Sequence, residues 1–85
     1  MATTIEQKIE ECFERNGFFT KVLNSKNEPY IIGKRDSLVF RVKVTKLSCG
    51  KEISICRYDL QVTEDYEFFT AKNFKSFYNF FLGRI

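Results

Sequence analysis

Few side chains of this sequence are suited to catalysis at neutral pH. The chain contains no histidine, so it lacks the side chain whose ordinary pKa suits a general base near pH 7. None of the phosphate-binding or nucleophile motifs GxGxxG, Walker loop, GxSxG or HExxH occurs. The sequence therefore predicts a protein that is not an enzyme, with no catalytic residue and no cofactor.

The three cysteines are the next candidates for chemistry, as a redox pair or as metal ligands. Cys12, Cys49 and Cys56 are odd in number and show no CxxC or CxxxC spacing. A zinc site needs about four Cys, His or carboxylate ligands, and this chain offers no histidine. We therefore expect no metal site and three free thiols, with Cys12 and Cys56 in the core and Cys49 accessible in a turn.

Basic side chains are concentrated in the middle of the chain. Residues 20 to 60 contain nine basic and four acidic side chains, against two and four in residues 1 to 19 and three and three in residues 61 to 85. The net charge of +3 therefore comes from the middle segment. This excess suits an anionic partner, although Lys and Arg also protect solvated sheet faces and edges from aggregation.

The length and composition fit one folded domain that spans residues 1 to 85. Apolar residues make up 44% of the chain and aromatic residues 16%, which is enough large side chain for one small core. The apolar runs are far shorter than the roughly 20 residues that cross a bilayer. The acidic residues near the start of the sequence do not fit a signal peptide. We expect a soluble, cytoplasmic protein with no membrane partner.

The first helix is predicted at the start of the chain, over about residues 4 to 16. Thr4 and Gln7 fit a capping box, and the apolar residues that follow recur at the spacing of one helix face. Asn16-Gly17 is the stop signal, because glycine tolerates the left-handed backbone that ends many helices. The glutamates of the other face could in principle hold a hard cation, but they are more simply a solvated surface.

The second helix is predicted near the end of the chain, with Thr70 as its cap and Gly83 as its stop. Residues spaced at i, i+3, i+4, i+7 and i+8 predict its buried face. These residues are Phe74, Phe77, Tyr78, Phe81 and Leu82. Phe69 and Phe80 fall outside this stripe, so we expect them to be exposed.

The middle of the chain is predicted to form antiparallel strands. Residues 18 to 23 and 30 to 32 form the first two, and residues 37 to 62 form a hairpin. A three-residue loop, Ser48-Cys49-Gly50, pairs Phe40 with Tyr58 and Val42 with Cys56, which gives one consistent apolar face. The alternative that pairs Val42 with Arg57 mixes apolar and charged side chains, so we favour the three-residue loop.

The predicted fold class is α+β, with the order α-β-β-β-β-α. The four strands form an antiparallel meander, and the two helices pack on one face of the sheet. Residues 63 to 69 fit a strand, a helical turn or a loop. The other face is open to a partner and, on the predicted register, carries Arg41, Lys43, Thr45, Ile53, Ile55 and Arg57.

This open face and its neighbouring strand contain the candidate partner-binding residues. Arg41 and Arg57 are predicted neighbours on it, and Ile53 and Ile55 would add an apolar patch with a charged rim, unless residues 63 to 70 or a second subunit cover them. The predicted site comprises Lys34, Arg35, Arg41, Lys43, Ile53, Ile55 and Arg57. The leading hypothesis is a protein partner; the alternatives are a nucleic acid, or a second copy in a structural homodimer.

No motif assigns the sequence to a family. In its size and predicted layout the chain resembles phage and mobile-element accessory proteins that inhibit a host machine by binding it, anti-CRISPR proteins among them. The resemblance implies a viral protein that acts as an inhibitor through protein binding. It transfers no residue roles, because no motif carries it.

Overall fold

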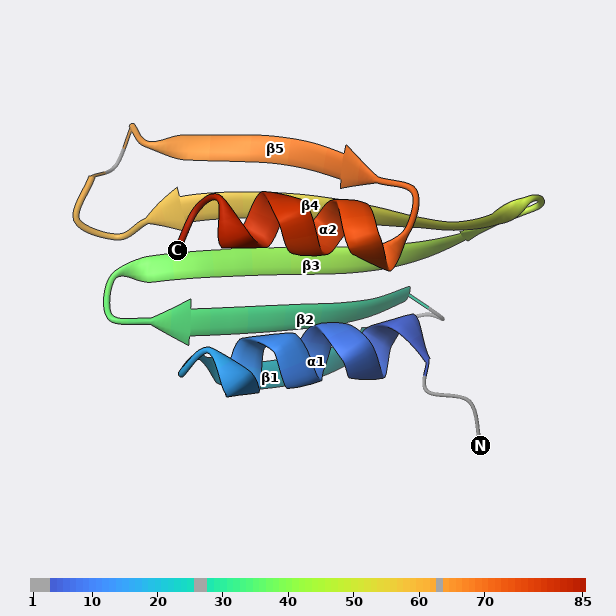
Figure 1. Ribbon diagram of the computed structural model, residues 1–85, viewed down its shortest axis with the longest axis horizontal. Helices are drawn as coiled ribbons and strands as arrows, with labels where there is room; N and C mark the ends of the chain where they lie inside the picture. Colours follow the sequence, from blue (N-terminus) through green and yellow to red (C-terminus); the bar gives the residue numbers. More distant parts are fainter. Residues whose placement is uncertain (1–3, 26–27, 63) are drawn as a thin grey trace.

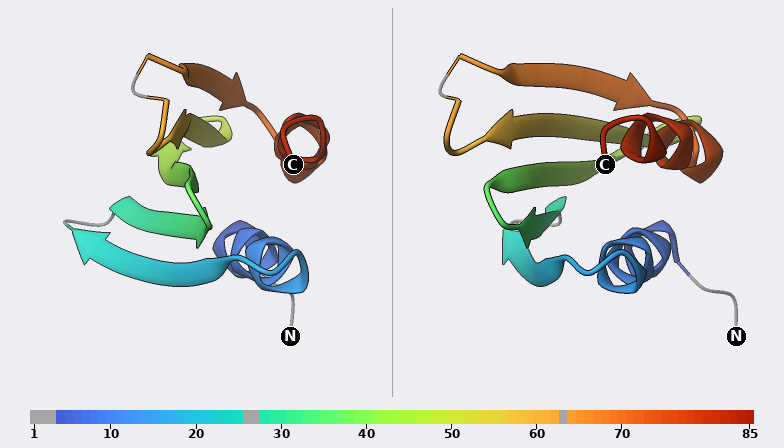
Figure 2. Two further views of the ribbon diagram at one scale, coloured as in Figure 1. Left: turned by 90° about the vertical axis from the view of Figure 1, so that its left-hand side faces the viewer. Right: turned by 60° about the vertical axis from the view of Figure 1, so that its left-hand side comes forward.

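The computed structural model describes residues 4–25, 28–62 and 64–85. The five strands form one antiparallel sheet in which each strand neighbours the next in sequence (Figure 1). Both helices lie on the same face of this sheet (Figure 2). The α+β class and the placement of the helices are therefore as predicted. The elements are α1 (Ile5–Arg15), β1 (Phe19–Ser25), β2 (Glu28–Arg35), β3 (Leu38–Leu47), β4 (Gly50–Asp59), β5 (Tyr66–Ala71) and α2 (Phe74–Leu82).

The sheet has one strand more than the four predicted. β5 pairs with β4 over its whole length, with Cys56 opposite Phe68 and Ile53 opposite Ala71. Most of β5 lies in the segment that the sequence left open between a strand, a turn and a loop; residue 63 of that segment lies outside the described residues. The acidic residues before β5 suit a helical turn equally well, so only pairing with β4 decides in favour of a strand.

Helix α1 matches its prediction closely. The Thr4 hydroxyl accepts a hydrogen bond from the Gln7 backbone N–H at 3.2 Å, and the Gln7 side chain accepts one from the Thr4 N–H at 3.0 Å. This reciprocal capping box satisfies two amides that lack partners within the helix. The helix ends at Arg15, and Gly17 has the positive φ of 79° expected of a stop signal.

Helix α2 begins later than predicted. Its N-cap is Asn73, whose side-chain oxygen accepts a hydrogen bond from the Ser76 N–H at 2.9 Å, whereas Thr70 lies in β5. The predicted exposure of Phe80 is also wrong, because its ring is buried and stacks on Phe69 with centroids 4.6 Å apart. The additional strand beside the helix shifts the buried face, and Tyr78 is consequently 39% exposed.

The β3–β4 hairpin has a different register from the one predicted. Its turn consists of Ser48 and Cys49 alone, with Leu47 opposite Gly50, and this places Val42 opposite Ile55. The predicted three-residue loop is therefore wrong, although Gly50 has the expected positive φ, at 144°. A shift of one residue turns every side chain of a strand to the other face. On β4 it moves the isoleucines beneath the helices, where they bury more apolar surface than Ser54 and Cys56 would.

The core lies between the sheet and the two helices. Phe13 of α1 is at its centre, with ring centroids 5.4 to 6.0 Å from those of Phe18, Phe40, Phe77 and Phe81. These rings come from both helices, from β3 and from the residue just before β1, so one aromatic cluster joins the ends of the chain to the sheet. None of the helices in the described parts of the chain is long and apolar enough to span a membrane.

Candidate functional site

The face of the sheet that no helix covers is rich in exposed rings. We call it the open face, and strand alternation together with the pairing register gives its members. Those whose side chains are described are Phe19, Lys21, Leu23, Tyr30, Ile32, Lys34, Val39, Arg41, Lys43, Thr45, Leu47, Glu52, Ser54, Cys56, Tyr58, Tyr66, Phe68 and Thr70. Phe19 is 80% exposed, Phe68 75% and Tyr66 57%. Such large exposed rings gathered on one face are typical of a binding surface rather than of isolated surface residues.

The open face contains only part of the predicted site. Arg41 and Lys43 lie on it as predicted, and Lys34, a predicted site residue that was assigned to no face, lies on it as well. Ile53 and Ile55 were predicted there wrongly, since they are 0% and 2% exposed on the covered face. The cause is the hairpin register, because the one-residue shift exchanges the two faces of β4.

Arg35, the predicted site residue at the end of β2, holds α1 in place. Its guanidinium carbon lies 4.7 Å from the centroid of the Phe18 ring. Its Nη1 donates a hydrogen bond to the backbone oxygen of Asn16 at 2.8 Å. Arg35 therefore satisfies a carbonyl at the end of the helix and covers a core ring, instead of presenting its charge on the open face.

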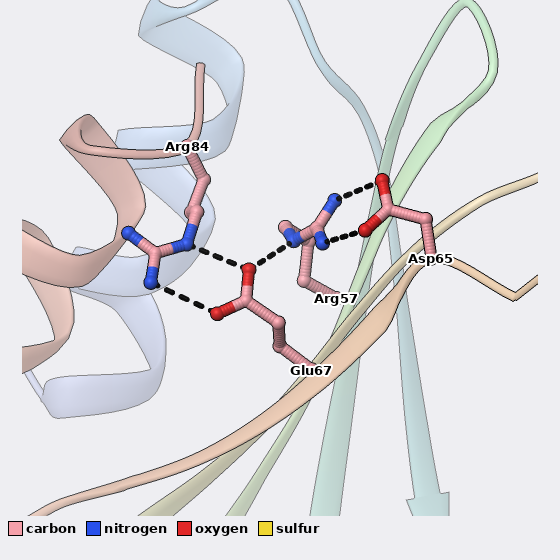
Figure 3. Close-up of polar contacts among 4 residues, drawn as sticks. All are labelled: Arg57, Asp65, Glu67 and Arg84. Atoms are coloured by element: carbon pink, nitrogen blue, oxygen red, sulfur yellow. Dashed lines mark hydrogen bonds and ion pairs between the residues drawn. The ribbon is translucent and has the colours of Figure 1, made fainter. Parts of the chain in front are cut away.

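Arg57 is the centre of an ion-pair network on the covered face (Figure 3). Arg57 lies opposite Phe40. The prediction that it neighbours Arg41 is therefore wrong. Nη2 of Arg57 lies 2.8 Å from Oδ1 of Asp65, and its Nε lies 3.0 Å from Oε1 of Glu67. These acids come from just before β5 and from β5 itself, and they explain how an arginine that is only 7% exposed is tolerated.

Arg84, beyond the end of α2, completes this network. Its Nε and Nη2 donate to the two carboxylate oxygens of Glu67 at 2.8 and 2.9 Å. Hydrogen bonding to Arg84 and then to Arg57 outweighs desolvation and lowers the pKa of the Glu67 carboxyl. The hydrogen bond to Asp65 raises the pKa of Arg57 in turn. The guanidinium of Arg57 is paired with Asp65 and Glu67 within the protein. Arg57 therefore links β4 to β5 and needs no external anion to balance its charge.

Two hollows lie side by side on the open face, with volumes of about 400 and 360 Å³. Arg41 and Cys56 line both of them and are direct cross-strand partners. Tyr66 contributes to the larger hollow and Phe68 to the smaller one. Two recesses, each lined by one exposed ring of β5, therefore flank a single guanidinium.

The charge of the open face is predominantly positive. Among its members named above, four are basic and only Glu52 is acidic. The guanidinium carbon of Arg41 lies 6.0 Å from the centroid of the Tyr30 ring, and Nζ of Lys43 lies 5.7 Å from it. Asp59 also lines the larger hollow, and the hydrogen bond from the Gln61 N–H at 2.8 Å lowers the pKa of its carboxyl, so it adds one negative charge there. The surface thus attracts anions at its centre.

The cysteines match the prediction except at one position. All three are free, with Cys12 buried and Cys49 exposed. Burial raises the pKa of Cys12 to about 11, which keeps its thiol protonated. Cys56 is only half-buried and lies on the open face, because the register differs from the predicted one. In the described parts of the chain, no three His, Cys, Asp or Glu side chains are grouped so that they could hold a metal ion.

The exposed rings of Phe19, Tyr66 and Phe68 are absent from the predicted site. The sequence feature that could have identified them is the alternation of large apolar side chains along the two outer strands. In β5 this alternation can be recognised only after the segment has been identified as a strand. In comparisons with known proteins, no family model, no curated protein and no solved structure matches this chain.

Proposed function

We propose that this chain is a non-enzymatic protein-binding module and that its binding surface is the open face. The observation that carries the proposal is the pair of neighbouring hollows that share Arg41. A partner segment with two apolar side chains on either side of a carboxylate would fill both hollows and pair its charge with the guanidinium. Arg and aromatic side chains are the residues that most often dominate protein interfaces.

The exposed rings supply the apolar part of this surface. Covering Phe68 and Tyr66 removes ring surface from water, and full burial of a large apolar side chain is worth roughly 1.5–3 kcal/mol. Leu23 and Leu60, which are 43% and 52% exposed, extend the apolar area from β1 to the segment after β4. A patch of this composition favours a protein partner.

The positive centre of the open face determines which kind of protein would bind. Arg41 and Lys43 line the hollows, and Lys21 and Lys34 add positive charge on β1 and β2. Glu52 on the open face and Asp59 at the larger hollow offset part of this charge. An acidic partner would be drawn to this surface before contact, since complementary charge raises association rates. We therefore propose an acidic partner surface with apolar side chains at its middle.

A nucleic acid is the second candidate partner, and one observation favours it. The ring of Tyr30 lies beside two cations, and such rings with adjacent Arg or Lys side chains can stack on bases and neutralise phosphates. The modest net charge of +3 and the exposed aliphatic side chains favour protein over nucleic acid.

The proposal is tested by capturing partners from a lysate of the source organism with the purified chain, with and without nuclease. Phe68→Ala and Arg41→Glu change the open face, whereas Tyr78→Ala and Lys75→Glu are matched changes of exposed residues on α2. We expect the two open-face variants to lose a nuclease-resistant protein that both control variants retain. Loss of the captured material on nuclease treatment would favour the nucleic acid. Equal capture by all four variants would refute the open face as the binding surface.

The resemblance to accessory proteins of phages and mobile elements adds inhibition to the proposal. If binding inhibits the partner, the purified chain should lower the activity of the captured protein in proportion to the occupied fraction. The Phe68→Ala variant should inhibit correspondingly less at the same concentration. Undiminished partner activity at saturation would leave a binding module without an inhibitory role.

A further inference from the structure

We infer that the outer edge of β5 accepts an extended, acidic segment of the partner as a sixth strand of the sheet. This inference rests on the proposed function, because Tyr66 and Phe68 line the hollows of the open face and also belong to the edge strand. Among the described strands, β5 pairs with β4 alone, and Figure 1 shows it as the outermost strand of the sheet. An outermost strand presents backbone N–H and C=O groups along its free side, which a further strand can pair with.

β5 lacks the features that usually protect an edge. It contains no Pro, Lys or Arg, and its pairing with β4 runs without a bulge from Tyr66 to Ala71. Its single charged residue is Glu67, whose carboxylate is already bound by Arg57 and Arg84 on the covered face. No unneutralised charge on this strand therefore repels an approaching one.

The opposite edge of the sheet differs in this respect. β1 carries Lys21 within the strand, and this side chain is exposed on the open face. A lysine at an edge hinders pairing, because adding a strand beside it costs desolvation of its charge. β5 is therefore the edge of this sheet that is better suited to receive a strand.

β5 is also held in its paired conformation before any partner arrives. The Phe69 ring stacks on Phe80 of α2 with an interplanar angle of 3°. The contacts of Glu67 to Arg57 and Arg84 add polar links to β4 and to the end of the chain. A strand already ordered in the free protein loses little conformational entropy when another strand pairs with it, which favours binding.

The charge of the chain favours a foreign acidic segment over a second copy of the protein. Antiparallel pairing of two β5 strands in one continuous sheet would place both open faces on the same side. Among the residues whose side chains are described, each face carries four basic members and one acidic member, so the two copies would repel each other. An acidic strand would instead lie near the positive charge of Lys72, which directly follows β5.

The test uses the full chain labelled with ¹⁵N and the acetylated, amidated peptide Glu-Val-Glu-Val-Glu-Val-Glu as the probe. One control peptide carries N-methyl groups on its three central residues, which removes backbone donors from both of its edges but keeps every side chain. A second control replaces all glutamates by lysines. Amide shifts and hydrogen exchange are followed across the whole chain during each titration.

We expect the acidic peptide to slow exchange at alternate amides between Tyr66 and Ala71, because alternate N–H groups of a strand point to the same edge. Both control peptides should bind at least about tenfold more weakly, which corresponds to about 1.4 kcal/mol. Slow exchange confined to alternate β5 amides is a signature that docking of side chains on the open face does not produce.

Three outcomes would overturn the inference. Equal binding of the N-methylated peptide, with shifts at Arg41 and Cys56 but no added protection in β5, would leave open-face binding intact and exclude strand addition. Absence of any shift in β5 at millimolar peptide would exclude it as well, and the capture experiment with Phe68→Ala would still test the open face separately. Protection of β5 that rises with protein concentration alone would show that a second copy pairs with this edge.

Discussion

The ring of Phe13 in α1 lies directly against Gly33 in β2. A Cβ atom at position 33 would stand 2.7 Å from Cγ of Phe13 and less than 3 Å from both of its Cδ atoms. Gly33 is paired regularly with Thr20 and Phe40, so it does not form a bulge. The glycine is required because it allows the central ring of the core to approach the sheet backbone.

Gly33→Ala should lower the free energy of unfolding by about 1–3 kcal/mol, the usual range for overpacking a core. The Phe13 ring has little room to move, because four other rings surround it. Gly83→Ala is the matched control, since its Cβ would make only ordinary contacts of 3.5 Å or more. Urea unfolding of the two variants measures the difference, and equal midpoints would contradict this account of Gly33.

Ile53→Asp should unfold the protein, whereas Phe68→Asp should leave it folded. Ile53 is fully buried, and an unpaired carboxylate there costs several kcal/mol, which is a large fraction of the stability of a small domain. Phe68 is 75% exposed, so its replacement should change stability by about 1 kcal/mol or less. Circular dichroism during urea titration distinguishes the two variants. A folded Ile53→Asp protein would contradict the β4 register described above.

Glu67→Gln should destabilise the protein at pH 7 but have progressively less effect as the pH falls. Because the folded-state pKa of Glu67 is lowered, its carboxylate contributes stability above its unfolded pKa, and this contribution is lost as the pH falls towards the folded pKa. The difference between variant and wild type should therefore shrink below the ordinary value of 4.5. Urea unfolding at pH 7 and pH 3 provides the measurement, with exposed Glu14→Gln as the control. A difference that is equal at both pH values would contradict the ion-pair network.

The three thiols should react with iodoacetamide in the order Cys49, Cys56, Cys12. Cys49 is exposed and Cys56 is half-buried on the open face. Cys12 is buried and has a pKa of about 11, so roughly one thiol in a thousand is ionised at pH 8. Mass spectrometry of proteolytic peptides after timed labelling gives the three rates. Labelling of Cys12 as fast as Cys49 in the folded chain would contradict its buried position.

The features that depend on neighbouring residues were predictable from the sequence alone. The capping box of Thr4 and Gln7, the stop at Gly17 and the helical spacing of Phe77 and Phe81 depend on contacts within one or two turns. The absence of histidine and the positive charge of the middle segment follow directly from composition. The α+β class, the antiparallel sheet and the positions of Arg41 and Lys43 on the uncovered face of the sheet were predicted from the sequence.

Only the tertiary structure decided which face of β4 is buried and which side chains lie on the open face. Apolar side chains occupy both alternating sets of β4, with Ile53 and Ile55 in one and Cys56 and Tyr58 in the other, so alternation alone could not choose the register. Packing of the helices on the sheet determines the register, because Ile53 and Ile55 then fill the core beside Val42 and Val44. Pairing with β4 likewise made a strand of Tyr66–Ala71 and left Phe68 exposed. These outcomes depend on contacts between segments distant in sequence, which no local pattern specifies.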